Sequence, residues 1–265
     1  MSLTQRLLAH AGTLDDLAGR PTALGGLDAR CKLTVALGFV VAAASFGRDA
    51  VLQPLPLLLY LAVAFALGDV PVGVVARRVA LLSPFALFVG IGDWLFHRTQ
   101  VLTIGSWTVS EGAISFATLS IRFVLCASAV FLLAATTRFS DIVSAMRRLG
   151  MPRVLSTQLL LAHRYFFVLA EEAGRLGRAH ALRSPGRGPR LGEATMLLTQ
   201  LLLRSLARAE RVHAAMSCRG FEGDLTVAPP RALRAGDLVF LAGWLSFFGL
   251  VRAVDLPAVL GRLVT

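Results

Sequence analysis

The chain has 265 residues and a formal net charge of +11, with 55% apolar and only 16% charged residues. Soluble globular domains are closer to about 45–50% apolar and about 25% charged, so the composition excludes an ordinary soluble domain and favours a membrane protein. In such a protein the basic residues indicate the cytoplasmic side of the bilayer, and we expect no nucleic-acid partner.

The first fourteen residues have no long apolar core and no small-residue cleavage pattern, so we expect no secretory signal there. Five apolar stretches farther along predict transmembrane helices. Crossing a bilayer takes about 20 residues, with about 17 as the lower limit, so the first two predicted spans are short. Pro54 and Pro56 stand near the start of the second span, where helices tolerate proline best. The predicted spans are 32–47, 51–68, 79–97, 112–136 and 236–254.

The distribution of Lys and Arg predicts the orientation. With the N-terminus inside, the cytoplasmic segments hold four in residues 1–32, two at Arg77 and Arg78, and sixteen in 137–235, which makes 22. The outer segments hold four: Arg48, Arg98, Arg252 and Arg262. Even if the long 137–235 segment is discounted, basic residues flank the inner ends of the spans. We therefore expect residues 1–136 to form a membrane bundle with a cytoplasmic N-terminus, and 236–265 to form the last span and an outer tail.

One charge lies inside a predicted span. Arg122 falls midway through 112–136, where insertion costs on the order of 2.5–3.5 kcal/mol unless the guanidinium is paired. Asp93 is a candidate partner in an internal ion pair, and Glu111 is another. A structural pair is favoured over a role in a substrate path.

The segment 137–235 is polar but strongly helical, and we expect it in the cytoplasm. Its sequence predicts a short amphipathic helix capped by Ser140 and stopped by Gly150 and Pro152. A long amphipathic helix follows from about 153, and two prolines and three glycines in 184–192 interrupt it. A second long helix ends at Gly220 and has Arg204, Arg208 and Arg211 on its polar side.

Both long helices end at an arginine with small neighbours, Arg183 in "HALRSPG" and Arg219 in "MSCRGFEGD". A guanidinium is permanently charged and forks onto carboxylates, and small neighbours let it approach the wall of a groove. A docking role is therefore favoured over the alternative, a solvated helix end that interacts with the helix dipole.

Three stretches resemble the transmembrane T components of energy-coupling factor transporters, especially their CbiQ-type cobalt-uptake members. "LDARCKL" (27–33) resembles the entry to the family's first span, although Ala29 replaces the usual proline. Residues 136–176 are the most specific match, and "AMSCRGF" (215–221) is similar to the family's Ala-Met-x-x-Arg-Gly-Phe. Leu182-Arg183-Ser184 departs from the family's commoner Ala-Arg-Gly-like triplet but keeps the arginine.

The resemblance implies an all-α integral membrane protein of about five transmembrane helices with long cytoplasmic coupling helices, in a bacterial cytoplasmic membrane. It implies two cytoplasmic ABC ATPase subunits and a membrane substrate-binding subunit as partners, with ATP on the ATPases and cobalt on the substrate-binding subunit. This chain would bind no cofactor or metal and catalyse no reaction. The resemblance places ATPase docking at Leu182, Arg183, Ser184, Cys218, Arg219 and Gly220.

Motifs for other functions are missing from the sequence. The only lysine, Lys32, is in no phosphate-binding loop, and neither the five histidines nor the three cysteines have metal-ligand spacing. Two alternatives stay open: a T component for nickel or a vitamin, and an integral membrane enzyme. The second is disfavoured because the predicted spans hold few ionisable residues.

Overall fold

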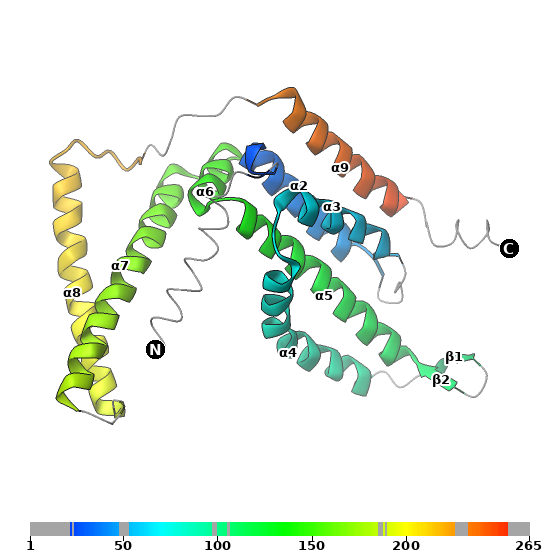
Figure 1. Cartoon of the computed structure of the whole chain (residues 1–265), viewed down its shortest axis with the longest axis horizontal. Helices are drawn as coiled ribbons and strands as arrows, with labels where there is room; N and C mark the ends of the chain where they lie inside the picture. The colour runs from blue at the N-terminus through cyan, green and yellow to red at the C-terminus, as the bar shows by residue number, and fades with distance from the viewer. Residues whose placement is uncertain are drawn as a thin grey trace. The chain divides into compact units, whose positions relative to one another are not determined.

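The computed structural model describes residues 22, 24–47, 53–96, 100–104, 107–184, 188, 190–225 and 233–253. The chain divides into two compact units (Figure 1). Leu17–Arg138 and Arg231–Thr265 form the first, here called the bundle unit, and Met1–Asp16 and Phe139–Pro230 form the second, the long-helix unit.

The bundle unit is built around α5 (Glu111–Thr136), which packs against α2 (Ala29–Ala44), α3 (Leu58–Gly68) and α4 (Val72–Phe96). The last helix, α9 (Ala235–Ala253), lies along α2. Two short 3-10 turns, η1 (Leu24–Gly26) and η2 (Leu55–Leu57), precede α2 and α3. A hairpin of β1 (Gln100–Ile104) and β2 (Trp107–Ser110) connects α4 to α5.

An aromatic cluster joins α2, α3 and α9. The ring of Tyr60 lies 5.0 Å from that of Phe39 and 4.9 Å from that of Trp244, and Phe39 is fully buried. Phe248 packs edge-on against Phe39 at 5.7 Å. Such pairs contribute about 0.5–1.5 kcal/mol each beyond their buried area, so this cluster is a main stabilising feature of the bundle.

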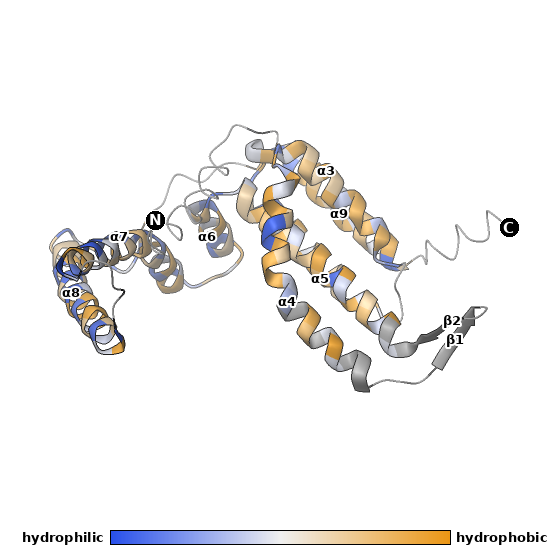
Figure 2. Cartoon of the chain, turned by 60° about the horizontal axis from the view of Figure 1, so that its bottom comes forward, coloured by the Kyte–Doolittle hydropathy of each residue, from blue (hydrophilic) through white to orange (hydrophobic). Residues whose placement is uncertain are grey.

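The outer surface of the bundle is apolar as well. Leu81 and Phe88 of α4 are each 79% exposed, and Figure 2 shows hydrophobic residues around most of α3, α5 and α9. A helix that is apolar on both its packed and its outer side suits a lipid environment. Among the described residues, two segments are long and apolar enough to cross a bilayer, Ile114–Thr136 and Ala235–Ala253. The prediction of an all-α membrane protein is confirmed, apart from the one hairpin.

The helix bounds differ from the predicted spans in three places. α2 begins three residues early because the Asp28 side chain accepts a hydrogen bond from the Arg30 amide and caps the helix. Regular helix in the second stretch is only Leu58–Gly68, since Pro54 and Pro56 allow no more than a 3-10 turn before it. α4 begins at Val72, directly after Pro71, because Arg77 and Arg78 are good helix formers and continue the helix toward the predicted span. The total of five crossings stays a prediction.

The long-helix unit contains α6 (Phe139–Arg148), α7 (Arg153–Arg183) and α8 (Leu191–Ser217). α6 packs on α7, and α7 packs on α8. The predicted stop of α6 at Gly150 is confirmed, but Ser140 lies inside the helix and does not cap it. α7 and α8 run in opposite directions, joined by the short connection around 184–190 (Figure 1).

Candidate functional site

The C-terminal end of α7 presents one of the two predicted docking arginines. Arg183 is the last residue of α7, and Ser184 closes the helix by donating its amide hydrogen to the His180 carbonyl at 3.0 Å. Arg183 is exposed, and the preceding Leu182 is 85% exposed. This helix end therefore exposes an apolar side chain directly beside a cationic one.

The C-terminal end of α8 presents the other arginine. The chain reverses at Gly220, whose φ of +76° favours glycine, and the Phe221 amide donates to the Met216 carbonyl at 3.1 Å. This arrangement ends the helix sharply and leaves Cys218, Arg219 and Gly220 exposed. Local hydrogen bonds therefore fix the backbone at each helix end, while both guanidinium groups face outward.

The two ends are far apart. α8 runs antiparallel to α7 from the connection where Arg183 lies, and its 27 residues correspond to about 40 Å at 1.5 Å per residue. Arg219 therefore lies roughly one helix length from Arg183. The structure does not bring the two arginines together; it places them at two separate helix ends.

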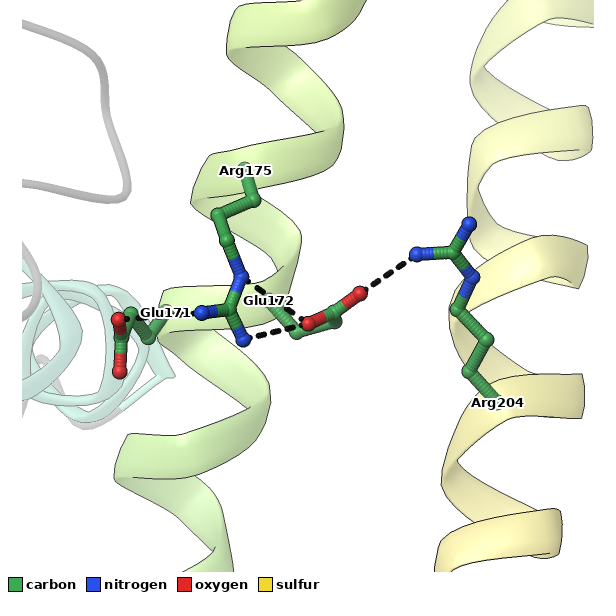
Figure 3. Close-up of polar contacts among 4 residues, drawn as sticks. All are labelled: Glu171, Glu172, Arg175 and Arg204. Carbon is green, nitrogen blue, oxygen red and sulfur yellow. Dashed lines mark hydrogen bonds and ion pairs between the residues drawn. The ribbon is translucent and has the colours of Figure 1, made fainter.

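An ion-pair network joins α7 to α8 near their middles. Arg204 of α8 donates from Nη1 to Oε1 of Glu172 at 2.7 Å, and Arg175 donates from Nη2 to Oε2 of the same carboxylate at 2.6 Å (Figure 3). Hydrogen bonds from Arg204 and then Arg175 hold the pKa of Glu172 below its ordinary value. The sequence placed Arg204 with Arg208 and Arg211 on a polar face, but its partner on α7 was missed because no local pattern pairs residues 32 apart.

A second polar cluster lies inside the bundle unit and involves the "LDARCKL" stretch. Lys32 is 6% exposed and donates from Nζ to the Thr136 carbonyl at the end of α5, at 3.1 Å. Asp237 in the first turn of α9 is 4% exposed and accepts hydrogen bonds from the amides of Asp28 and Arg234. The "LDARCKL" stretch therefore joins the ends of α2, α5 and α9. The part that Asp237 takes in this cluster was not predicted from the sequence.

Arg122, the charge inside α5, donates from Nη2 to the carbonyl of Gly47, just beyond α2. A backbone carbonyl just beyond a helix end is a suitable partner for this half-buried cation. The side chains of the two candidate partners, Asp93 and Glu111, lie outside the described residues, so the Arg122–Asp93 pair stays a prediction. The described part of the chain contains no group of three His, Cys, Asp or Glu residues that could hold a metal ion.

The sequence model of the Cobalt transport protein family, CbiQ, matches residues 22–229. The chain belongs to the CbiQ family. The matched range includes all three stretches that carry the resemblance, and Arg183 and Arg219, the two predicted docking arginines, lie inside it.

Individual relatives share part of the chain. A Cobalt transport protein CbiQ of Rhodobacter capsulatus is 34% identical over 102 residues, 37% of this chain and 41% of the relative. The CbiQ protein of Salmonella typhimurium is 31% identical over 107 residues, 39% of this chain and 47% of that protein. An uncharacterized protein of Methanocaldococcus jannaschii is 27% identical over 134 residues, 49% of this chain and 46% of that protein. The chain thus spans somewhat less than half the length of the curated relatives it matches.

Proposed function

We propose that this chain is the transmembrane coupling subunit of an energy-coupling factor importer, with the cobalt ion as its cargo. Membership of the CbiQ family supports a role in cobalt transport, and the names of two relatives, both called cobalt transport protein, support the choice of cargo. In this proposal a separate membrane subunit binds the cobalt ion, two cytoplasmic ATPases bind ATP, and this chain joins them without catalysing a reaction.

One observation supports the coupling role most directly: the two exposed arginines stand at the ends of long antiparallel helices, about 40 Å apart. Two ATPase subunits would offer two similar grooves, and one arginine would enter each. A carboxylate in the groove would form a desolvated ion pair with the guanidinium. Removing one partner of such a pair typically costs about 2–5 kcal/mol of binding free energy.

Transmission of movement requires stiff helices. An α-helix resists compression because each backbone hydrogen bond spans one turn, so a displacement at Arg219 reaches the far end of α8. The Glu172–Arg204 pair would make α7 follow α8. When ATP draws the two ATPases together, they would change the angle between α7 and α8. This movement of the two helices would act on the substrate-binding subunit.

The membrane setting forms part of the proposal. We place the protein in a bacterial cytoplasmic membrane as a multi-pass protein with its N-terminus inside. The distribution of Lys and Arg supports this orientation, because 22 fall on the proposed cytoplasmic side and four outside. The long-helix unit would then lie in the cytoplasm, where the ATPases are.

The experiment that tests the proposal is co-purification of this chain with the proposed ATPase subunits. Arg183→Glu and Arg219→Glu place an anion where a cation is expected, so each should reduce ATPase recovery and the double variant should reduce it further. Arg178→Glu on α7 and Arg211→Glu on α8 are matched controls, because both arginines are exposed and lie before the helix ends. Equal ATPase recovery with the double variant and the controls would refute the docking role.

A further inference from the structure

The segment that follows α8 folds back against the start of the long-helix unit. Arg147 of α6 donates from Nη1 to Oδ1 of Asp224 at 2.7 Å and from Nη2 to Oδ2 at 2.6 Å. This two-pronged geometry is the strongest form of a carboxylate–guanidinium contact. Both side chains are about 30% exposed, so solvent screens the pair only partly.

The side-chain hydroxyl of Thr157 in α7 holds the backbone of the same segment. Its hydroxyl donates to the Gly223 carbonyl at 3.0 Å and accepts from the Leu225 amide at 3.4 Å. Thr157 is 5% exposed, and Gly223 has a φ of +86°, which a side chain would make unfavourable. The segment is therefore fixed by both the Asp224 side chain and the adjacent peptide groups.

Arg147, which binds Asp224, lies at an end of α6 whose backbone is fixed by hydrogen bonds. Gly150 has a φ of +113°, and the Met151 amide donates to the Met146 carbonyl at 3.1 Å. The Gly150 amide donates to the carbonyl of Arg147 at 3.2 Å. These bonds close the last turn of α6, so Arg147 projects from a helix end of fixed geometry.

The helix that the segment restrains has little else to hold it. None of the residues of α8 is buried, and Leu191 and Met196 are 92% and 70% exposed. Apolar packing therefore contributes little to the direction of α8, and polar contacts must set it. The Glu172–Arg204 pair acts near the middle of α8, which leaves the Arg219 end to be fixed separately.

Asp224 follows Arg219 by five positions, with only four residues between them. Five residue steps span at most about 17 Å when fully extended, and the turn at Gly220 shortens this distance. A fixed Asp224 therefore confines Arg219 to a small region. Without the contact to Arg147, the end of α8 could pivot about its middle contact to α7.

We propose that Arg147, Thr157 and Asp224 form a latch that positions Arg219 for docking on one ATPase. The latch residues touch no partner themselves and act through the direction of α8. The docking half of this inference rests on the proposed function, whereas the latch itself is a property of the isolated chain. Arg183 ends α7 and does not depend on the latch.

Hydrogen exchange on the purified chain without partners tests the latch. Asp224→Asn and Arg147→Gln should speed amide exchange in residues 218–225 severalfold, because the two-pronged charged contact is lost. Glu222→Gln and Arg148→Gln are matched controls, since both residues are exposed and adjoin the latch. The exchanged pair Arg147→Asp with Asp224→Arg should restore slow exchange. Equal amide exchange rates for residues 218–225 in the Asp224→Asn and Glu222→Gln variants would overturn the latch.

ATPase affinity tests the positioning. Asp224→Asn should weaken binding about fivefold, as expected for a partly buried charged contact. Added to Arg219→Glu it should cause no further loss, because both act at one contact; added to Arg183→Glu its effect should be retained in full. Additive losses with Arg219→Glu would overturn the positioning role. An Arg219→Glu chain that binds the ATPases normally would instead refute the docking function, and the exchange result would still decide the latch.

Discussion

The backbone amide of Asp28 donates a hydrogen bond to Oδ1 of Asp237 at 3.0 Å, across 209 residues of sequence. Asp28 caps α2, and Asp237 lies in the first turn of α9, so one contact ties two helix N-termini together. Both residues are buried, at 6% and 4% exposure. The carboxylates lie at the positive ends of both helix dipoles, which stabilises their charge.

Asp237→Asn should therefore lower the thermal stability of the protein. The amide cannot accept both hydrogen bonds, from Asp28 and Arg234, and leaving a buried donor unpaired costs about 1–3 kcal/mol. We expect the melting temperature in detergent to fall by several degrees. Asp69→Asn is the control, because Asp69 is exposed and its φ of 47° suits asparagine. Equal melting temperatures for the two variants would contradict the role given to Asp237.

The close approach of α4 and α5 at Gly90 gives a second prediction. A Cβ at this position would lie 2.5 Å from Cδ2 of Phe116, a ring that cannot bend aside. Gly90→Ala should destabilise the bundle by about 1–3 kcal/mol through overpacking. Gly92→Ala, two residues later, meets nothing within 4 Å and should be neutral or slightly stabilising. Unfolding in detergent measures both, and a neutral Gly90→Ala would show that the helices are not in close contact there.

The network at Glu172 predicts a dependence on pH. Because the two arginines lower the pKa of Glu172, its contribution to stability is present above the ordinary value of 4.5 and is lost as the pH falls through the lower value in the folded chain. The stability difference between the wild type and Glu172→Gln should be constant from about pH 7 to about pH 5 and shrink below. Glu171→Gln, at the more exposed neighbouring carboxylate, should show a smaller difference. A difference that grows on acidification would contradict the ion pair.

The proposed orientation can be tested by labelling single cysteines from outside intact cells. Cys218 is exposed and should first be replaced, together with Cys31 and Cys126. Gly188→Cys, between the long helices, should be shielded, whereas Gln100→Cys and Thr265→Cys should react. Labelling at 188 with protection at 100 would invert the topology.

Sequence patterns predicted the long helices well. The predicted spans 112–136 and 236–254 agree with α5 and α9 within one residue, because long apolar runs end at charged residues. Arg183 and Gly220 were placed correctly at helix ends for a similar reason, since glycine and proline interrupt helical periodicity. These features depend only on neighbours in sequence.

Contacts between distant residues were not predictable in this way. Neither the pairing of Asp28 with Asp237 nor that of Arg147 with Asp224 leaves a local pattern, because each depends on how helices pack. The hairpin was different, because its sequence does contain a local signal. Two runs of alternating residues on either side of Gly105-Ser106 are typical of a β-hairpin. The signal was missed because the runs lie between two apolar predicted spans.

Cobalt uptake tests the central claim most directly. Vesicles containing this chain and the proposed substrate-binding and ATPase subunits, with the ATPases and ATP inside, should accumulate radioactive cobalt. The Arg183→Glu/Arg219→Glu double variant should insert normally yet lose ATP-dependent uptake, while the Arg178→Glu/Arg211→Glu control keeps it. Wild-type uptake by the first double variant would contradict coupling through the two helix ends.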